Sequence, residues 1–240
     1  MGAAQLMNLA FRLKNKLALG SLLVVASIIS VVLEGLNRSY YNNHGPNLVW
    51  NLILAWIPFI AAVMAYLTRH NRITFFLIMP FCTLVWLIFF PNAPYLLTDF
   101  QHLANSSGSP PLWFDVIRMI WFAWTGLFLG IASLYLMQEI VTDLTTPWLG
   151  WVFAIAMTVM SSIGVYLGRF LRWNSWDLLQ EPLLIAKDMA SIVRHPISNL
   201  PTYVFTILFT LLFLFIYLTI HVFGHIMREH RETKERGPAR

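Results

Sequence analysis

Long apolar runs constrain the fold of this chain more than any other sequence feature. Several of them approach 20 residues without a charged side chain near their centre, which is the length that a helix needs to cross a hydrocarbon layer of about 30 Å. Charged residues make up only 11% of the chain, whereas a soluble domain carries about 25%. We therefore predict an all-α fold, a polytopic transmembrane helix bundle of about six spans.

Short polar connections separate the predicted spans. The spans cover about residues 17–36, 48–67, 73–90, 112–137, 148–168 and 200–226. No long polar linker divides the chain, so we expect a single integral membrane domain, 1–240, that ends in a short tail over 227–240. Between the fifth and sixth spans, apolar residues recur at helical spacing from Leu178 to Val193 with charged residues between them. This pattern predicts an amphipathic helix in the membrane interface.

The basic residues predict the orientation in the membrane. The N-terminal segment, the connection over 68–72 and the C-terminal tail are all basic, and the positive-inside rule places this side, with both termini, in the cytoplasm. The connection over 169–199 is also rich in basic residues, yet it falls on the outer side. Two alternatives therefore stay open: either 178–194 re-enters the membrane or one span is miscounted.

Composition also limits the ligands and partners. The net charge of +5 is concentrated at the two ends, which suits membrane lipids as partners and gives no reason to expect nucleic acid. The single cysteine, Cys82, lies in an apolar run, so neither disulfides nor a thiolate metal site are expected. His221 and His225 have metal-binding spacing but no third ligand nearby, so we expect no metal site. No phosphate-binding glycine loop is present, and the cofactor, if any, is unknown from the sequence.

One stretch, 89–103, reads FFPNAPYLLTDFQHL and gathers polar side chains at a predicted membrane boundary. Asp99 and His102 are its candidate catalytic residues, because a helical turn would place them on one face and a carboxylate beside an imidazole orients a general base. Asn92 and Tyr95 are candidates for binding substrate through hydrogen bonds. The alternative is structural, since Thr98 begins a capping-box pattern.

A second polar group follows the fifth span. Arg169 and Arg172 carry guanidinium forks that suit phosphate or carboxylate groups, and Asn174 and Asp177 extend the candidate substrate-binding set. The alternatives are contact with lipid headgroups and a structural bridge from Arg172 to Asp177 or Asp99.

Two further groups of charges lie within predicted spans. Asp115 and Arg118 are three residues apart and are expected to neutralise each other. Glu34 has no such neighbour, so we expect an arginine partner from elsewhere and treat Glu34 as a further substrate-binding candidate. The arginines that would serve are Arg38, Arg169 and Arg172.

Two segments resemble an uncharacterised protein family. The segment from Pro91 to Asp99, PNAPYLLTD, with His102 after it, resembles the signature of a group of bacterial polytopic membrane proteins, domain of unknown function 1361. The segment 168–177, GRFLRWNSWD, resembles the second typical segment of that family. The resemblance covers most of the chain, from the second span to the sixth. It implies a bacterial cell-membrane location and leaves the reaction open.

Three functions fit these residues. The first is a membrane-embedded hydrolase or transferase that acts at the extracytoplasmic face on an anionic lipid or lipid-linked substrate. The second is a carrier for a small or amphiphilic anion, which would need polar residues through the middle of the membrane. The third is a non-catalytic membrane partner or assembly protein, whose charges would all be satisfied by internal pairs.

Overall fold

The computed structural model is helical throughout the part of the chain that it describes, which is residues 3–41, 47–69, 72–105 and 110–236. Short connections join the helices, and no strand occurs among these residues. Six helical segments are long and apolar enough to cross a membrane, which confirms the predicted class and span number. The segments are Ala18–Tyr40, Leu48–Thr68, Phe76–Leu103, Leu112–Leu144, Pro147–Phe170 and Leu200–Gly224.

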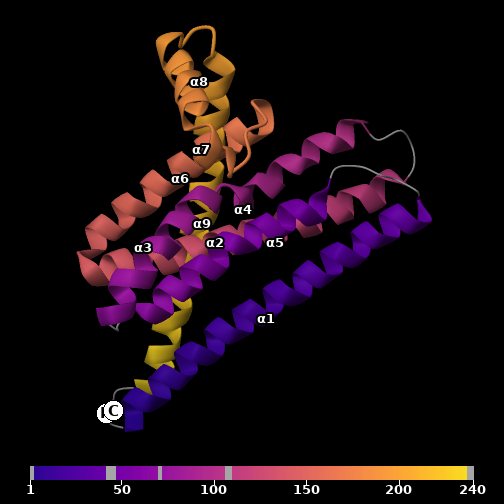
Figure 1. Cartoon of the computed structure of the whole chain (residues 1–240). Helices are drawn as coiled ribbons and strands as arrows, with labels where there is room; N and C mark the ends of the chain where they lie inside the picture. The colour runs from indigo at the N-terminus through magenta and orange to yellow at the C-terminus, as the bar shows by residue number, and fades with distance from the viewer. Residues whose placement is uncertain (1–2, 42–46, 70–71, 106–109, 237–240) are drawn as a thin grey trace. The chain divides into compact units, whose positions relative to one another are not determined.

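The chain divides into two compact units, Met1–Ile140 and Val141–Arg240. We describe each unit by itself (Figure 1). The prediction of a single domain stays a prediction.

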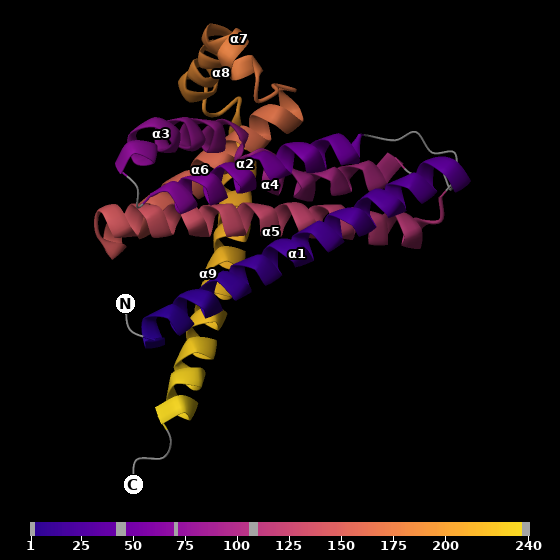
Figure 2. The same cartoon turned by 60° about the horizontal axis from the view of Figure 1, so that its bottom comes forward.

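The first unit is built mainly from long helices, and its third apolar segment is broken between residues 89 and 92. Its elements are α1 (Ala3–Tyr40), α2 (Leu48–Thr68), α3 (Arg72–Phe89), α4 (Asn92–Tyr95), the 3-10 helix η1 (Leu96–Asn105) and α5 (Leu112–Leu144), whose last turn enters the second unit. Helix α2 packs against α3 and α4 (Figure 2). Helix α5 is the most buried of the six spans: 72% of the residues in its most apolar 18-residue stretch are buried, against 44% for α2.

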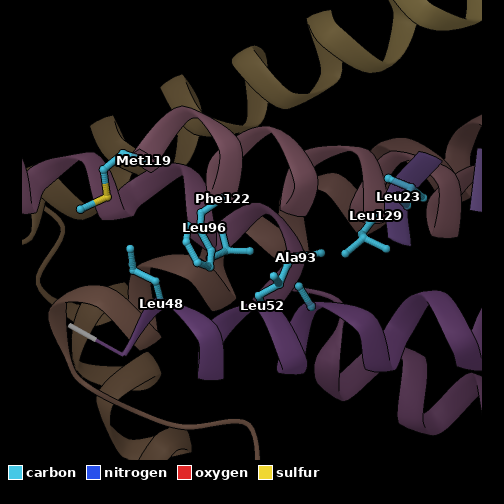
Figure 3. Close-up of a cluster of buried hydrophobic side chains, with 9 residues drawn as sticks. Leu23, Leu48, Leu52, Ala93, Leu96, Met119, Phe122 and Leu129 are labelled. Carbon is cyan, nitrogen blue, oxygen red and sulfur yellow. The ribbon is translucent and has the colours of Figure 1, made fainter. Parts of the chain in front are cut away.

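Apolar side chains from α1, α2, α4, η1 and α5 form the core of this unit (Figure 3). The buried residues of this cluster are Leu23, Leu48, Leu52, Ala55, Ala93, Leu96, Met119, Phe122 and Leu129. Lipid tails are as apolar as these side chains, so close packing rather than escape from water holds such a cluster together. Two members, Ala93 and Leu96, come from the segment that carries the candidate catalytic residues.

Several helices extend further than the predicted spans, including α1 (Ala3–Tyr40) and α5 (Leu112–Leu144). The third apolar segment continues to Leu103, not to about residue 90, because the chain resumes a helical course directly after Pro91. Proline is tolerated in the first turn of a helix, where its missing N–H has no partner in any case. At the C-terminus, helix α9 continues to Arg236 and takes up most of the predicted tail, of which 237–240 lie outside the described residues.

The second unit pairs two long helices, α6 (Pro147–Phe170) and α9 (Leu200–Arg236). Their aromatic contacts show an antiparallel arrangement. Near the start of α6 the ring of Trp151 lies 4.8 Å from that of His221, and at its end Phe170 lies 5.2 Å from Phe205. Between the two helices the chain forms α7 (Asp177–Gln180) and α8 (Pro182–Arg194). Helix α8 is the amphipathic helix that the sequence predicts at this place.

Gly126 of α5 allows a close approach of two backbones. A Cβ atom at this position would lie only 2.6 Å from the carbonyl oxygen of Ala93 and would also collide with the side chain of Leu96. A glycine therefore lets α4 lie directly on α5, as small residues do between helices in membranes. The position of the break, and of the polar side chains that follow it, depends on this contact.

We predict that Gly126→Ala lowers the unfolding midpoint of the detergent-solubilised protein, because the backbone of α4 must move to make room. Such overpacking costs about 1–3 kcal/mol. Gly35→Ala is the matched control: nothing lies within 4 Å of a Cβ at this position, and alanine is favoured over glycine in helices by up to about 1 kcal/mol. A midpoint for Gly126→Ala equal to or above that of Gly35→Ala would contradict the close contact.

Candidate functional site

The break in the third span is closed by side-chain hydrogen bonds. The Asn92 amide donates to the carbonyl oxygen of Phe89 over 3.0 Å, and the Thr98 hydroxyl donates to the carbonyl oxygen of Tyr95 over 2.7 Å. Carbonyl groups at a helix end lack partners within the helix, so these bonds stabilise the break. Asn92 therefore has a structural task here, and the substrate-binding role of Asn92 and Tyr95 stays a prediction.

Asp99 and His102 lie one turn apart on η1. A 3-10 helix has about three residues per turn, so side chains three positions apart are aligned along it. His102 Nε2 lies 3.9 Å from Asp99 Oδ1, and Asn51 Nδ2 of α2 donates to the other carboxylate oxygen over 3.3 Å. The Asp99 side chain is 2% exposed and that of His102 is 30% exposed. A buried carboxylate thus stands behind a partly exposed imidazole, and sequence reasoning missed Asn51 as its third member.

Glu34 belongs to a cluster of charges that links α1 to α5. One carboxylate oxygen of Glu34 accepts from Arg38 Nε over 2.8 Å and the other accepts from Arg118 Nη1. Arg118 Nη2 donates to Asp115 Oδ1 over 2.7 Å. The side chains of Glu34, Asp115 and Arg118 are at most 3% exposed, whereas that of Arg38 is 41% exposed.

Among the described residues the charges of this cluster balance, since its two carboxylates face two guanidinium groups. A buried charge far from water is expensive unless it is paired. Here Arg118 bonds to carboxylates from two helices, and Arg38 supplies the second positive charge. The expected pairing of Asp115 with Arg118 is present. Of the partners expected for Glu34, Arg38 is present, while its buried partner is Arg118, which the sequence analysis had assigned to Asp115 alone.

The array of Asn51, Asp99 and His102 and the charge cluster around Arg118 lie at the same end of the first unit. Glu34 stands near the end of α1, Asn51 near the start of α2, and Asp115 in the first turn of α5. In Figure 1 the end of α1 and the starts of α2 and α5 lie together on the right. Successive antiparallel helices thus bring side chains that are far apart in the sequence to one end of the unit.

The two candidate arginines of the second unit lie at the end of α6, with Arg169 in its last turn and Arg172 just after it. The carbonyl oxygen of Leu167 accepts from the amides of Leu171 and Trp173 over 3.2 and 3.1 Å, so the chain turns back sharply. Arg172, at the turn, has a φ of 63°, a left-handed conformation that costs a non-glycine residue about 1–2 kcal/mol. The side chain of Arg172 is exposed.

Asn174 and Asp177 form a turn of their own next to Arg172. Asp177 Oδ2 accepts from the Asn174 backbone amide over 2.7 Å and from its side-chain amide over 3.1 Å. These two residues therefore shape the connection after α6. Asp99 and Arg172 lie in different units, so the predicted convergence of the two polar groups, and the bridge between them, stay predictions.

Possible metal ligands are sparse. Within the described ranges, no three side chains of the types His, Cys, Asp and Glu lie close enough together to hold a metal ion. His221 packs against the rings of Trp151 and Tyr217. The side chain of His225, its predicted companion, lies outside the described residues.

A comparison with family models places the chain among known sequences. The model described as "Protein of unknown function (DUF1361)" matches residues 50–216. The chain belongs to this family. No curated protein and no solved structure matches it.

The DUF1361 match confirms the resemblance seen in the two polar segments. It includes Asp99, His102, Arg118 and Arg172 and begins after Glu34, so α1 lies before the matched region. The DUF1361 description gives no activity.

We predict that Arg118→Met strongly destabilises the protein, because it leaves the carboxylates of Glu34 and Asp115 buried without their shared cation. Removing one partner from a buried ion pair costs about 3–5 kcal/mol. Arg38→Met removes the exposed partner of the same cluster and should cost about 1 kcal/mol or less. Unfolding midpoints in one detergent compare the two.

A further variant separates charge from packing. Adding Glu34→Gln and Asp115→Asn to Arg118→Met removes the uncompensated charges and should restore part of the lost stability. The shared-cation description fails if Arg118→Met and Arg38→Met unfold at the same temperature, or if the added substitutions restore nothing.

Proposed function

We propose that this protein is a membrane-embedded hydrolase or transferase that acts at the extracytoplasmic face on an anionic lipid or lipid-linked substrate. The observation that carries the proposal is the array of Asn51, Asp99 and His102, in which a buried carboxylate stands behind a partly exposed imidazole. In an ordinary pair on a solvated surface, both side chains would be exposed.

In this function His102 acts as the general base and Asp99 positions it. A carboxylate that accepts the N–H of one ring nitrogen fixes the tautomer and makes the other nitrogen the one that takes a proton. The 3.9 Å separation of His102 Nε2 from Asp99 Oδ1 shortens to a hydrogen bond when substrate binds, as catalytic contacts often do. Asn51 holds the other carboxylate oxygen and so keeps Asp99 facing the ring.

The anionic group of the substrate binds to Arg169 and Arg172. Arginine recognises phosphate and carboxylate groups through two parallel N–H bonds. The left-handed backbone of Arg172 supports this role, because glycine would fit the turn with less strain and a strained residue is often kept for its side chain.

The proposed location is the bacterial inner membrane with both termini in the cytoplasm. Six successive spans place the connections after the first, third and fifth spans on one side. The N-terminal segment, the connection over 68–72 and the C-terminal tail, all basic, fall on the opposite side, which the positive-inside rule assigns to the cytoplasm. The Asp99 segment and the Arg172 turn then both face the extracytoplasmic side.

The two alternative functions draw on other observations. A carrier would use polar side chains in the middle of the spans, but the buried hydroxyls of Thr125 and Ser133 donate to carbonyl oxygens of their own helix. A non-catalytic partner is favoured by the neutral cluster around Arg118, which needs no ligand. This second candidate predicts that substitutions at Asp99 leave lipid composition unchanged.

We predict that Asp99→Asn and His102→Gln abolish a change in membrane lipids that the wild-type protein causes. Lipid extracts are compared by mass spectrometry between cells that lack the gene and cells that regain it as wild type or as a variant. Loss of a general base slows a reaction by about 10²–10⁴-fold, so the wild-type product should be absent from both variants.

Gln101→Ala is the matched control, because Gln101 lies on the same 3-10 helix and is exposed. It should restore the wild-type lipids in full. Wild-type lipid composition in cells that carry Asp99→Asn, at equal protein level, would rule out the enzyme and leave the non-catalytic role.

We also predict that Arg172→Gly separates stability from function. Glycine relieves the left-handed strain, so the unfolding midpoint should rise by an amount that corresponds to about 1–2 kcal/mol, while the lipid change caused by the wild type is lost. Arg172→Asn, which also tolerates this conformation, should behave in the same way. Full lipid conversion by Arg172→Gly would show that the guanidinium does not bind the substrate.

A further inference from the structure

We propose that the outward face of α8 binds anionic lipid headgroups of the leaflet beside it. This surface is defined here as Leu183, Lys187, Val193 and Arg194. It is separate from the proposed catalytic residues, and its test does not depend on the proposed reaction.

The burial pattern of α8 defines the face. Ile185 and Ile192 are buried, with 8% and 9% of their surface exposed. Leu183 and Val193, by contrast, are 76% and 66% exposed. A helix whose outward face contacts only water is not expected to expose two large apolar side chains there.

The charges of α8 are segregated between its two sides. Lys187 and Arg194 are both exposed on the outward face. The single acidic residue of the helix, Asp188, accepts a hydrogen bond from Trp173 Nε1 over 2.9 Å and so faces the protein. Glu181 precedes the helix. The outward face therefore offers basic and apolar groups together, which is the combination that binds an anionic membrane surface.

Neighbouring segments hold α8 in this orientation. The hydroxyl of Tyr203 on α9 donates to the carbonyl oxygen of Ile192 over 3.2 Å. The bond from Trp173 to Asp188 holds the other side of the helix from the turn after α6. Because α6 and α9 are both membrane spans, the helix between them stays at the membrane boundary.

A lipid surface fits this face better than a second copy of the chain. A symmetric dimer through α8 would set Lys187 and Arg194 against the same residues of the other copy. Like charges in such a contact repel, whereas phospholipid phosphates neutralise both side chains. Each basic side chain at the membrane surface raises the preference for an anionic lipid beside it about fivefold.

The experiment measures which lipid lies next to α8. In a Cys82→Ser background, Leu183→Cys is labelled with a fluorophore and the full chain is reconstituted in nanodiscs of phosphatidylcholine and phosphatidylglycerol. Either lipid is brominated in turn, and quenching gives the preference for phosphatidylglycerol over phosphatidylcholine at the label. Ile28→Cys, on an exposed position of α1 (57% exposed), is the matched control.

The expected preference for phosphatidylglycerol is about tenfold or more at position 183 and near one at position 28. Lys187→Gln with Arg194→Gln should lower the value at 183 towards one, without a change in the elution volume of the protein. Equal quenching by the two lipids at 183 would overturn the proposal. The proposal would also fail if only aqueous iodide quenched the label, which would place it in water. It would fail as well if quenching required a second labelled chain in the same disc, which would indicate contact between two copies.

Discussion

Arg118 carries the interaction on which the first unit depends, because it bonds to carboxylates from two helices inside an apolar environment. Helix α1 is little buried: only 17% of the residues in its most apolar stretch are buried. A hydrogen bond from Trp56 to Ser27 and the packing of Leu23 in the core also join it to the unit. The buried contact of Glu34 with Arg118 therefore fixes α1 against α5. A charge cluster of this kind gives specificity rather than large net stability, since desolvation offsets much of the attraction.

The break in the third span gives the unit its second set of polar groups. Proline ends the regular hydrogen bonding at residue 91, and Asn92 caps the released carbonyl group. Gly126 then lets the new helix lie against α5. The 3-10 geometry that follows aligns Asp99 with His102, and α2 contributes Asn51 from the other side. A helix break, close packing and polar chemistry thus meet within about four turns of chain.

The sequence was a good guide to elements and a poor guide to partners. Span positions followed from hydropathy, because a bilayer imposes a length on every apolar helix. The pairing of Asp99 with His102 followed from local spacing. The contact of Glu34 with Arg118 joins residues 84 positions apart, and no local pattern specifies it. The same holds for Asn51, and the left-handed Arg172 was hidden because arginine gives no signal for that conformation. The predicted convergence of the Asp99 segment with the Arg172 turn depends on how the units assemble, which hydropathy does not encode.

In the proposed reaction Asp99 orients His102 as a base. Solid-state nitrogen NMR of ¹⁵N-histidine-labelled protein in lipid can detect this orientation, with His102→Gln used to assign the His102 signals. We expect neutral His102 to carry its proton on Nε2, towards Asp99, and Asp99→Asn to change this tautomer balance. A proton on Nδ1, or a spectrum that Asp99→Asn leaves unchanged, would contradict it.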